Sequence, residues 1–141
     1  MNIYFACSLT GGRDNEALYG ALVDHLIALE HEVPTAHLAS PEVMDLEKIE
    51  APGEIFKRDV AWIQACDALV AEVSTPSHGV GYEIAYALSL KKPVLCLYHQ
   101  EVVVSKMITG NDMPGIYVRS YGDKAEALAR LESFLDRVKL A

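Results

Sequence analysis

The sequence predicts an α/β fold class, and three observations carry this prediction. First, about five short apolar runs alternate with segments of helical periodicity. Second, the run at residues 67–73 is almost uninterruptedly apolar, as is typical of a central strand in a parallel sheet. Third, 141 residues with 51% hydrophobic content suffice for one core but not for two. We therefore expect a single domain over residues 1–141, a doubly wound (Rossmann- or flavodoxin-like) sandwich with about five parallel strands.

The first half of the chain opens with a strand at residues 2–7, which leads into the polar turn SLTGGRD. A helix should follow to about Glu30, because leucines recur there at helical spacing, and Asp14 is a plausible N-cap. Residues 32–38 are interpreted as a second strand. Pro34 places that strand near an edge of the sheet, since proline has no N–H to give to a neighbouring strand.

The middle of the chain is less regular. Residues 39–52 carry two prolines among mixed charges, so we expect a loop with one helical turn around residues 41–49. The helical pattern returns at residues 54–65. The apolar strand at residues 67–73 then follows directly.

The remaining elements continue the alternation. The turn STPSHGVGYE is followed by a helix at residues 82–92 and a strand at residues 93–99. A loop or short helix to about residue 112 precedes a strand at residues 115–121. A closing helix is expected from Asp123.

Composition excludes several classes of partner. The formal net charge of −8 is spread along the chain, which predicts no binding to nucleic acid or to an anionic membrane surface. No apolar run approaches the ~20 residues that span a bilayer, and the first residues do not resemble a signal peptide, so we expect a cytoplasmic protein. Because Cys7, Cys66 and Cys96 lack metal-ligand or redox spacing, we expect no metal and no cofactor.

Two turns are candidates for a ligand site, because ligands of doubly wound sheets bind beyond the carboxyl ends of the strands, where strand order reverses. They are SLTGGRD after the first strand and STPSHGVGYE after the third. The hydroxyls, glycine amides and Arg13 of the first turn could cradle a phosphate at the following helix. The P-loop pattern is absent, so an ordinary strand-to-helix turn remains an equal alternative.

Glu83 is the first candidate for chemistry. We expect it in the first turn of its helix, where exposed amides and the helix dipole would keep the carboxylate ionised. It is then either a nucleophile or an ordinary helix-start acid. Gly79 and Gly81 would let a ligand approach the backbone closely, although the dinucleotide fingerprint fails at Ile84.

Asp59 is the second candidate, because it falls on the predicted apolar stripe of its helix, together with Phe56 and Ile63. A carboxyl group there is either held by a structural partner or buried with a raised pKa, which would make it a usable general acid. One ionised Glu83 and one protonated Asp59 at a common pocket would suit cleavage of a glycosidic bond.

The chain resembles a known family at residues 4–13, 59–83 and 94–98. These segments, YFACSLTGGR, DVAWIQACDALVAEVSTPSHGVGYE and VLCLY, are similar to the 2'-deoxynucleoside 5'-phosphate N-hydrolases, a branch of the nucleoside 2-deoxyribosyltransferase superfamily. The resemblance implies hydrolysis of the N-glycosidic bond of 2'-deoxynucleoside 5'-monophosphates to free base and 2-deoxyribose 5-phosphate.

The resemblance also implies roles for individual residues. Glu83 would attack the anomeric carbon to form a glycosyl-glutamate, Tyr4 would orient Glu83, and Asp59 would protonate or hold the departing base. Ser105 to Met107 would complete the site of a neighbouring subunit, which implies a homodimer. The complete set of expected substrate-binding residues is Ser8, Leu9, Thr10, Gly11, Gly12, Arg13, Tyr19, His37, Ser77, Gly79, Gly81, Ser105, Lys106 and Met107.

The chain departs from the family pattern at two positions. Thr10 stands where the mammalian-type hydrolase carries an arginine, so the phosphate site loses a charge that Arg13 or Lys106 is hypothesised to supply. His78 replaces an apolar residue, which points to a different base selectivity. Two alternatives stay open: a 2-deoxyribosyltransferase that uses the same Glu83 intermediate, and a nucleotide-binding sensor without turnover. The transferases usually contribute a C-terminal asparagine and tyrosine to the neighbouring site. These two residues have no clear match in this chain, which favours hydrolysis.

Overall fold

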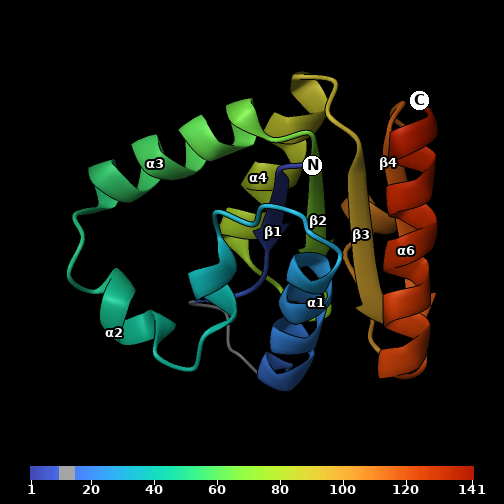
Figure 1. Cartoon of the computed structure of the whole chain (residues 1–141), viewed down its shortest axis with the longest axis horizontal. Helices are drawn as coiled ribbons and strands as arrows, with labels where there is room; N and C mark the ends of the chain where they lie inside the picture. Colours follow the sequence, from blue (N-terminus) through green and yellow to red (C-terminus); the bar gives the residue numbers. More distant parts are fainter. Residues whose placement is uncertain (10–14) are drawn as a thin grey trace.

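A computed structural model describes residues 1–9 and 15–141, apart from the side chains of Leu46 and Glu47. Within the described residues, parallel strands form one sheet of four in the order β1-β2-β3-β4 (Figure 1). The strands are β1 (Ile3–Ala6), β2 (Ala68–Glu72), β3 (Val94–His99) and β4 (Ile116–Tyr121). The helices are α1 (Glu16–Ala28), the 3-10 helix η1 (Ala36–Ala39), α2 (Val43–Glu47), α3 (Pro52–Ala65), α4 (His78–Ser89), α5 (Lys106–Thr109) and α6 (Lys124–Leu140).

The helices cover both faces of the sheet, which confirms the α/β class with a parallel sheet. Side chains of α1 and α6 pack in one core with Ile3 and Phe5 of β1. Side chains of α3 and α4 pack in a second core with Tyr4 and Ala6, because successive residues of a strand point to opposite faces. Figure 1 shows α1 and α6 in front of the sheet and α4 behind it. Tyr4 is thereby directed toward the α3 and α4 side.

The strand predicted at residues 32–38 is wrong, and the sheet has four strands in the described chain rather than about five. Only Glu32 remains of it, as a single parallel bridge to Asn2. The chain then turns into η1. The Phe5 N–H, which a neighbouring strand would have bonded, donates instead to Oγ1 of Thr35 at 2.9 Å. A threonine side chain thus replaces the backbone ladder just after Pro34, which has no N–H.

The other boundaries agree with the predictions to within a few residues, with one exception that matters. The short helix α2 lies inside the expected 41–49 segment, and α3 begins two residues early, at Pro52. Asp14, the expected cap of α1, lies outside the described residues. Helix α4 begins at His78 rather than at residue 82, because Oγ of Ser77 accepts the Val80 N–H at 3.3 Å and caps the helix there.

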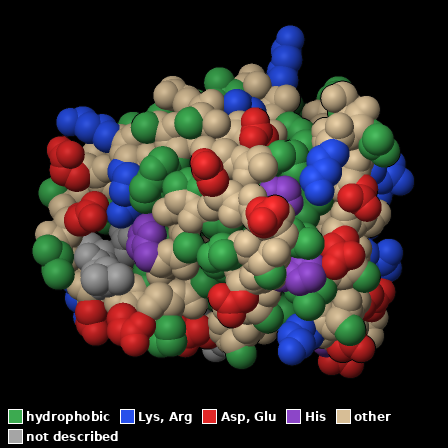
Figure 2. All heavy atoms as spheres, viewed as in Figure 1, with side chains coloured by type: hydrophobic (Ala, Val, Ile, Leu, Met, Phe, Trp, Pro, Cys, Tyr) green, Lys and Arg blue, Asp and Glu red, His purple; other side chains and the backbone are tan. Residues whose placement is uncertain are grey.

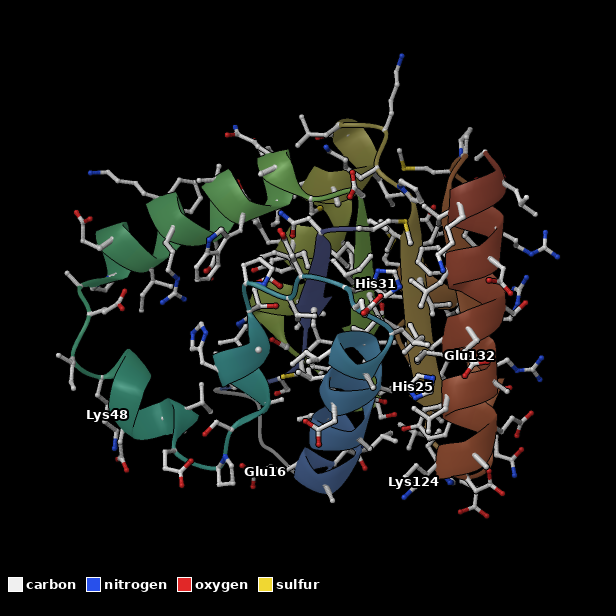
Figure 3. All side chains as sticks on the ribbon, viewed as in Figure 1. Glu16, His25, His31, Lys48, Lys124 and Glu132 are labelled. Carbon is white, nitrogen blue, oxygen red and sulfur yellow. The ribbon has the colours of Figure 1, made fainter. Side chains whose placement is uncertain are left out.

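Polar contacts and charged side chains lie on the outer surface. Nε2 of His25 in α1 lies 2.7 Å from Oε1 of Glu132 in α6, so this contact links the two helices (Figure 3). On the face in Figure 2, basic and acidic side chains lie interspersed. No helix among the described residues is long and apolar enough to cross a bilayer. The cytoplasmic location stays a prediction.

Candidate active site

Two cavities flank helix α4, one on each side. The first, of about 650 Å³, opens between α3, α4 and the segment that precedes α3. The second, of about 490 Å³, opens between α4 and residues 103–113. The first is the candidate active site because it brings Asp59 and Glu83 to one space. Its lining comprises Lys48, Glu50, Pro52, Ile55, Phe56, Asp59, Val60, Ile63, Gly79, Tyr82 and Glu83.

Glu83 differs from its sequence prediction in both position and charge. Because α4 begins at His78, Glu83 lies in the second turn, away from the exposed amides that were expected to keep it ionised. The residue is half-buried, yet its carboxyl group is deep enough that burial raises its pKa to about 8. The negative charge of Asp59 raises the pKa further, whereas Tyr4 and Arg58 lower it. The raised pKa favours the protonated form of this carboxyl group near neutral pH.

Tyr4 meets Glu83 from the sheet. The ring is fully buried on β1, and burial followed by the charges of Glu83 and Asp59 raises the pKa of the phenol. Hydrogen bonding to Glu83 also contributes to that rise. Among the described residues, the Tyr4 hydroxyl has no partner of ordinary hydrogen-bond geometry, so its bond to Glu83 is long or poorly aligned.

Asp59 is held by a cation. Its side chain is 17% exposed, and Oδ1 lies 2.9 Å from Nε of Arg58. The predicted apolar stripe is only partly correct, because Ile63 is buried whereas Phe56 is 55% exposed and contacts the Tyr82 ring at a tilt. Asp59 consequently has a structural partner, Arg58, and also faces the cavity. Its role as a general acid stays a prediction.

Arg58, which the sequence analysis missed, lies beside Asp59. Arg58 lies with its guanidinium carbon 4.9 Å from the ring centroid of Trp62, one helical turn further along α3. The Trp62 ring in turn contacts His37 of η1 edge to face, at 6.0 Å between centroids. Two features of the sequence could have indicated these contacts: Arg58 directly precedes Asp59, and it lies four residues before Trp62. His37 is thereby brought to the same side of the sheet as the two carboxyl groups.

Glycine 79 keeps the nucleophile candidate accessible. A Cβ added there would lie 4.0 Å from Oε1 of Glu83 and 3.9 Å from Oγ of Ser77, which is ordinary contact distance. A side chain at this position would fit sterically but would cover the Glu83 carboxyl group. Glycine therefore leaves that face open to a ligand.

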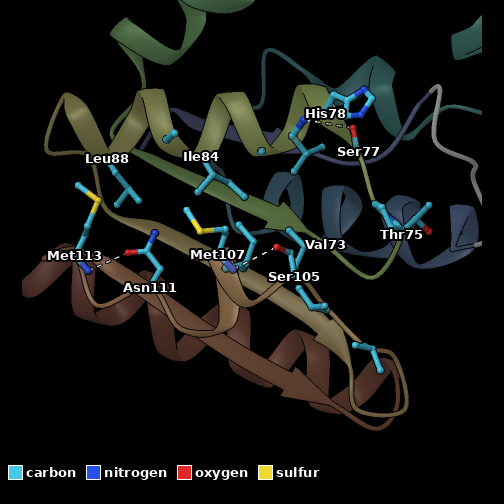
Figure 4. A pocket seen from close by; sticks show the side chains of 17 residues that line it. Val73, Thr75, Ser77, His78, Ile84, Leu88, Ser105, Met107, Asn111 and Met113 are labelled. Carbon is cyan, nitrogen blue, oxygen red and sulfur yellow. Dashed lines mark hydrogen bonds between the residues drawn. The ribbon is translucent and has the colours of Figure 1, made fainter.

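Other predicted substrate residues lie elsewhere. Ser77, Gly81, Ser105 and Met107 line the second cavity, across α4 from the carboxyl groups (Figure 4). Ser8 and Tyr19 are fully buried, and Tyr19 packs edge to face on Phe5, on the α1 side of the sheet. Leu9 packs beside the same core, and Lys106 begins α5. Thr10 to Arg13 lie outside the described residues, and all these substrate-binding roles stay predictions.

Comparisons with known proteins identify the family to which the chain is similar. The family model for nucleoside 2-deoxyribosyltransferases matches residues 3–127. A Methanosarcina mazei protein, provisionally named a 2'-deoxynucleoside 5'-phosphate N-hydrolase, is 43% identical over 92% of this chain and 80% of its own length. The 5-hydroxymethyl-dUMP N-hydrolase of Rattus norvegicus is 38% identical over 96% of this chain and 83% of its own.

A solved structure supports the fold. The CMP N-glycosidase of Clostridium botulinum superimposes with a TM-score of 0.70 at 19% identity, over 94% of this chain and 99% of that one. At this identity the likeness concerns the architecture alone. The parallel sheet with helices on both faces is therefore shared with that glycosidase.

Proposed function

Because the chain belongs to the nucleoside 2-deoxyribosyltransferase family, we propose that it hydrolyses the N-glycosidic bond of 2'-deoxynucleoside 5'-monophosphates. The products would be free base and 2-deoxyribose 5-phosphate. The chain is an N-glycosyl hydrolase, the class of enzyme named in its relatives at 38% and 43% identity. The observation that carries the proposal is that two carboxyl groups in unlike environments, Glu83 and Asp59, line one cavity.

The proposed reaction has two steps. The Glu83 carboxylate attacks the anomeric carbon, the C–N bond breaks, and its electron pair leaves with the base, which takes a proton by way of Asp59. Water then attacks the glycosyl-glutamate, which releases the sugar phosphate and regenerates the carboxyl group. Glu83 must first lose the proton that its raised pKa retains at neutral pH. That proton is the one which the departing base requires, so no external acid is needed.

A second copy of the chain is part of the proposal. Ser105, Lys106 and Met107 are expected to complete the neighbouring subunit's site, and the second cavity supports this expectation. Its rim carries unusually exposed apolar side chains, with Val103 at 94% and Met107 at 81% exposure. Ile84 and Leu88 of α4 face Met107 and Met113 across it (Figure 4). Such a surface is suited to burial against another copy.

The test is base release from a panel of nucleotides. Deoxynucleotides, ribonucleotides and unphosphorylated nucleosides are incubated with wild type or Glu83→Gln, with and without an added acceptor base, and separated by chromatography. We expect free base from deoxynucleoside monophosphates with wild type and none with the variant. Incorporation of the acceptor base into product would establish the transferase instead. Tight nucleotide binding without any turnover would establish the binding module.

A further inference from the structure

Arg58 is held from three sides beside the candidate active site. Its Nε lies 2.9 Å from Oδ1 of Asp59, and its Nη1 lies 3.3 Å from Oε2 of Glu50. The guanidinium also lies over the ring of Trp62, at 4.9 Å from the centroid. The side chain is only 19% exposed. Adjacent residues of a helix normally point about 100° apart, so the bond to Asp59 requires Arg58 to fold back along α3.

Arg58 stands beside the cavity lining. Among the described residues it does not itself line the cavity, whereas its two acidic partners, Glu50 and Asp59, do. The third carboxyl group of the described lining is Glu83, and the basic residue of that lining is Lys48. A cation paired with two of these three carboxyl groups alters their charge balance.

The groups that bear on Glu83 come from several elements. Tyr4 approaches from β1, and Asp59 and Arg58 act from α3. Lys48 and Glu50 face the same cavity from the segment between α2 and α3. Among these, the charge of Asp59 opposes ionisation of Glu83 and raises its pKa, whereas the charge of Arg58 lowers it. The ion pair therefore offsets in part the repulsion between the two carboxyl groups.

We propose that Arg58 is a positioning residue for base release: it fixes the Asp59 carboxyl group through Oδ1, which orients that group for the departing base, and its positive charge partly offsets the repulsion between the Asp59 and Glu83 carboxyl groups. This inference rests on the proposed function for its catalytic meaning. The effect of the Arg58 charge on Glu83 can be measured without substrate. A purely structural Arg58 would hold α3 to Glu50 but would leave the titration of Glu83 unchanged.

The first test follows the protonation of Glu83 directly. The protein is labelled with ¹³C at glutamate carboxyl carbons, and the Glu83 signal is assigned by its loss in Glu83→Gln. Removing the cation in Arg58→Met should move the titration midpoint upward by about 0.5 to 1 pH unit, the size expected for one partly screened charge. Arg58→Lys should keep the midpoint near that of wild type, because it keeps the charge.

Controls separate this effect from general loss of charge or of structure. Lys57→Met removes a cation from the exposed face of the same helix, where Lys57 pairs with Glu54 at 3.6 Å, and should leave the midpoint unmoved. If Arg58→Met does not fold, Arg58→Gln removes the charge with a polar side chain of similar reach. An unchanged Glu83 midpoint in the folded uncharged variant, or an equal shift in Lys57→Met, would overturn the electrostatic half.

The second test uses turnover and separates geometry from charge. In Arg58→Met, the alkaline limb of the kcat/KM profile for deoxynucleotide should move upward with the Glu83 titration, because the departing base receives the proton that Glu83 carries. Arg58→Lys should keep that limb but lose about 3- to 10-fold in kcat, because a point charge cannot hold Oδ1 as the guanidinium does. A wild-type kcat in Arg58→Lys would refute the positioning half. If wild type releases no base, the proposed function fails, and the ¹³C titration still decides whether Arg58 tunes Glu83.

Discussion

The two cavities on either side of α4 differ in the kind of side chain that they gather. Among the described residues, the cavity toward α3 holds three carboxyl groups, Glu50, Asp59 and Glu83, and Arg58 pairs with the first two. The cavity toward residues 103–113 is lined mainly by valines, isoleucines, methionines and Leu88, and its polar side chains are Thr75, Ser77, His78, Ser105 and Asn111. Helix α4 thus has one side that faces carboxyl groups and one side that faces apolar side chains. This difference supports the proposal that the reaction takes place on one side of α4 and association with a second copy on the other.

The largest expected effect is confined to the acidic cavity. Asp59→Asn keeps the size of the side chain but removes the group that passes a proton to the base, so kcat for deoxynucleotide should fall about 10²-fold, the usual contribution of general acid catalysis. Single-turnover base release measures this step apart from product release. The matched change on the other side is Asp112→Asn, beside the lining residues Asn111 and Met113, which should retain the wild-type rate. Equal losses in the two variants would contradict the assignment of chemistry to the α3 side.

The next effect belongs to the apolar cavity. Met107→Asp places a charge on an 81% exposed methionine at its rim, which should weaken association of two copies about 10- to 100-fold because the charge would be buried in the interface. Sedimentation velocity over a concentration series gives the dissociation constant. Met107→Leu, which keeps the apolar surface, serves as the control. A wild-type monomer over the whole series would rule out the homodimer.

The sequence predicted which carboxyl groups line the cavity toward α3 better than it predicted their burial and ionisation. The pairing of Asp59 with Glu83 followed from an acid on a helical stripe and an acid after a glycine turn, and both do reach one cavity. The ionised state expected of Glu83 was wrong. Glycines and a serine precede it, and they led to a predicted helix start that is four residues too late, whereas α4 begins at His78. Burial of a second-turn carboxyl group depends on packing against β1 and α3, which no local pattern contains.

The fold itself was predictable wherever backbone pairing decides it. Strands β1 to β4 all lie within predicted runs. The failure at residues 32–38 came from a side chain, since Oγ1 of Thr35 accepts the Phe5 N–H that a strand would have bonded. Arg58 was missed for a similar reason. Its role depends on folding back to Asp59, which spacing along a helix does not predict.

The smallest expected effect concerns stability, and it separates the buried carboxyl group from the rest of the acidic cavity. The folded-state pKa of Glu83, about 8, lies above the ~4.3 of an unfolded chain. Between these values the unfolded state has lost the proton and the folded state retains it, so this group lowers stability progressively as pH rises through that window. Below the lower value both states are protonated, and the effect vanishes.

Glu83→Gln removes the titration but keeps a neutral side chain of the same shape. Its melting temperature should match that of wild type near pH 4.5 and exceed it increasingly up to pH 8, where the gain in free energy of unfolding should reach about 1 to 3 kcal/mol. Differential scanning calorimetry across this range measures the gap. The exposed Glu101→Gln should show no such trend, because its carboxyl group is solvated in both states. A gap that stays constant with pH would mean that Glu83 is ionised in the folded protein, and the proton that we assign to the departing base would then have to come from another group.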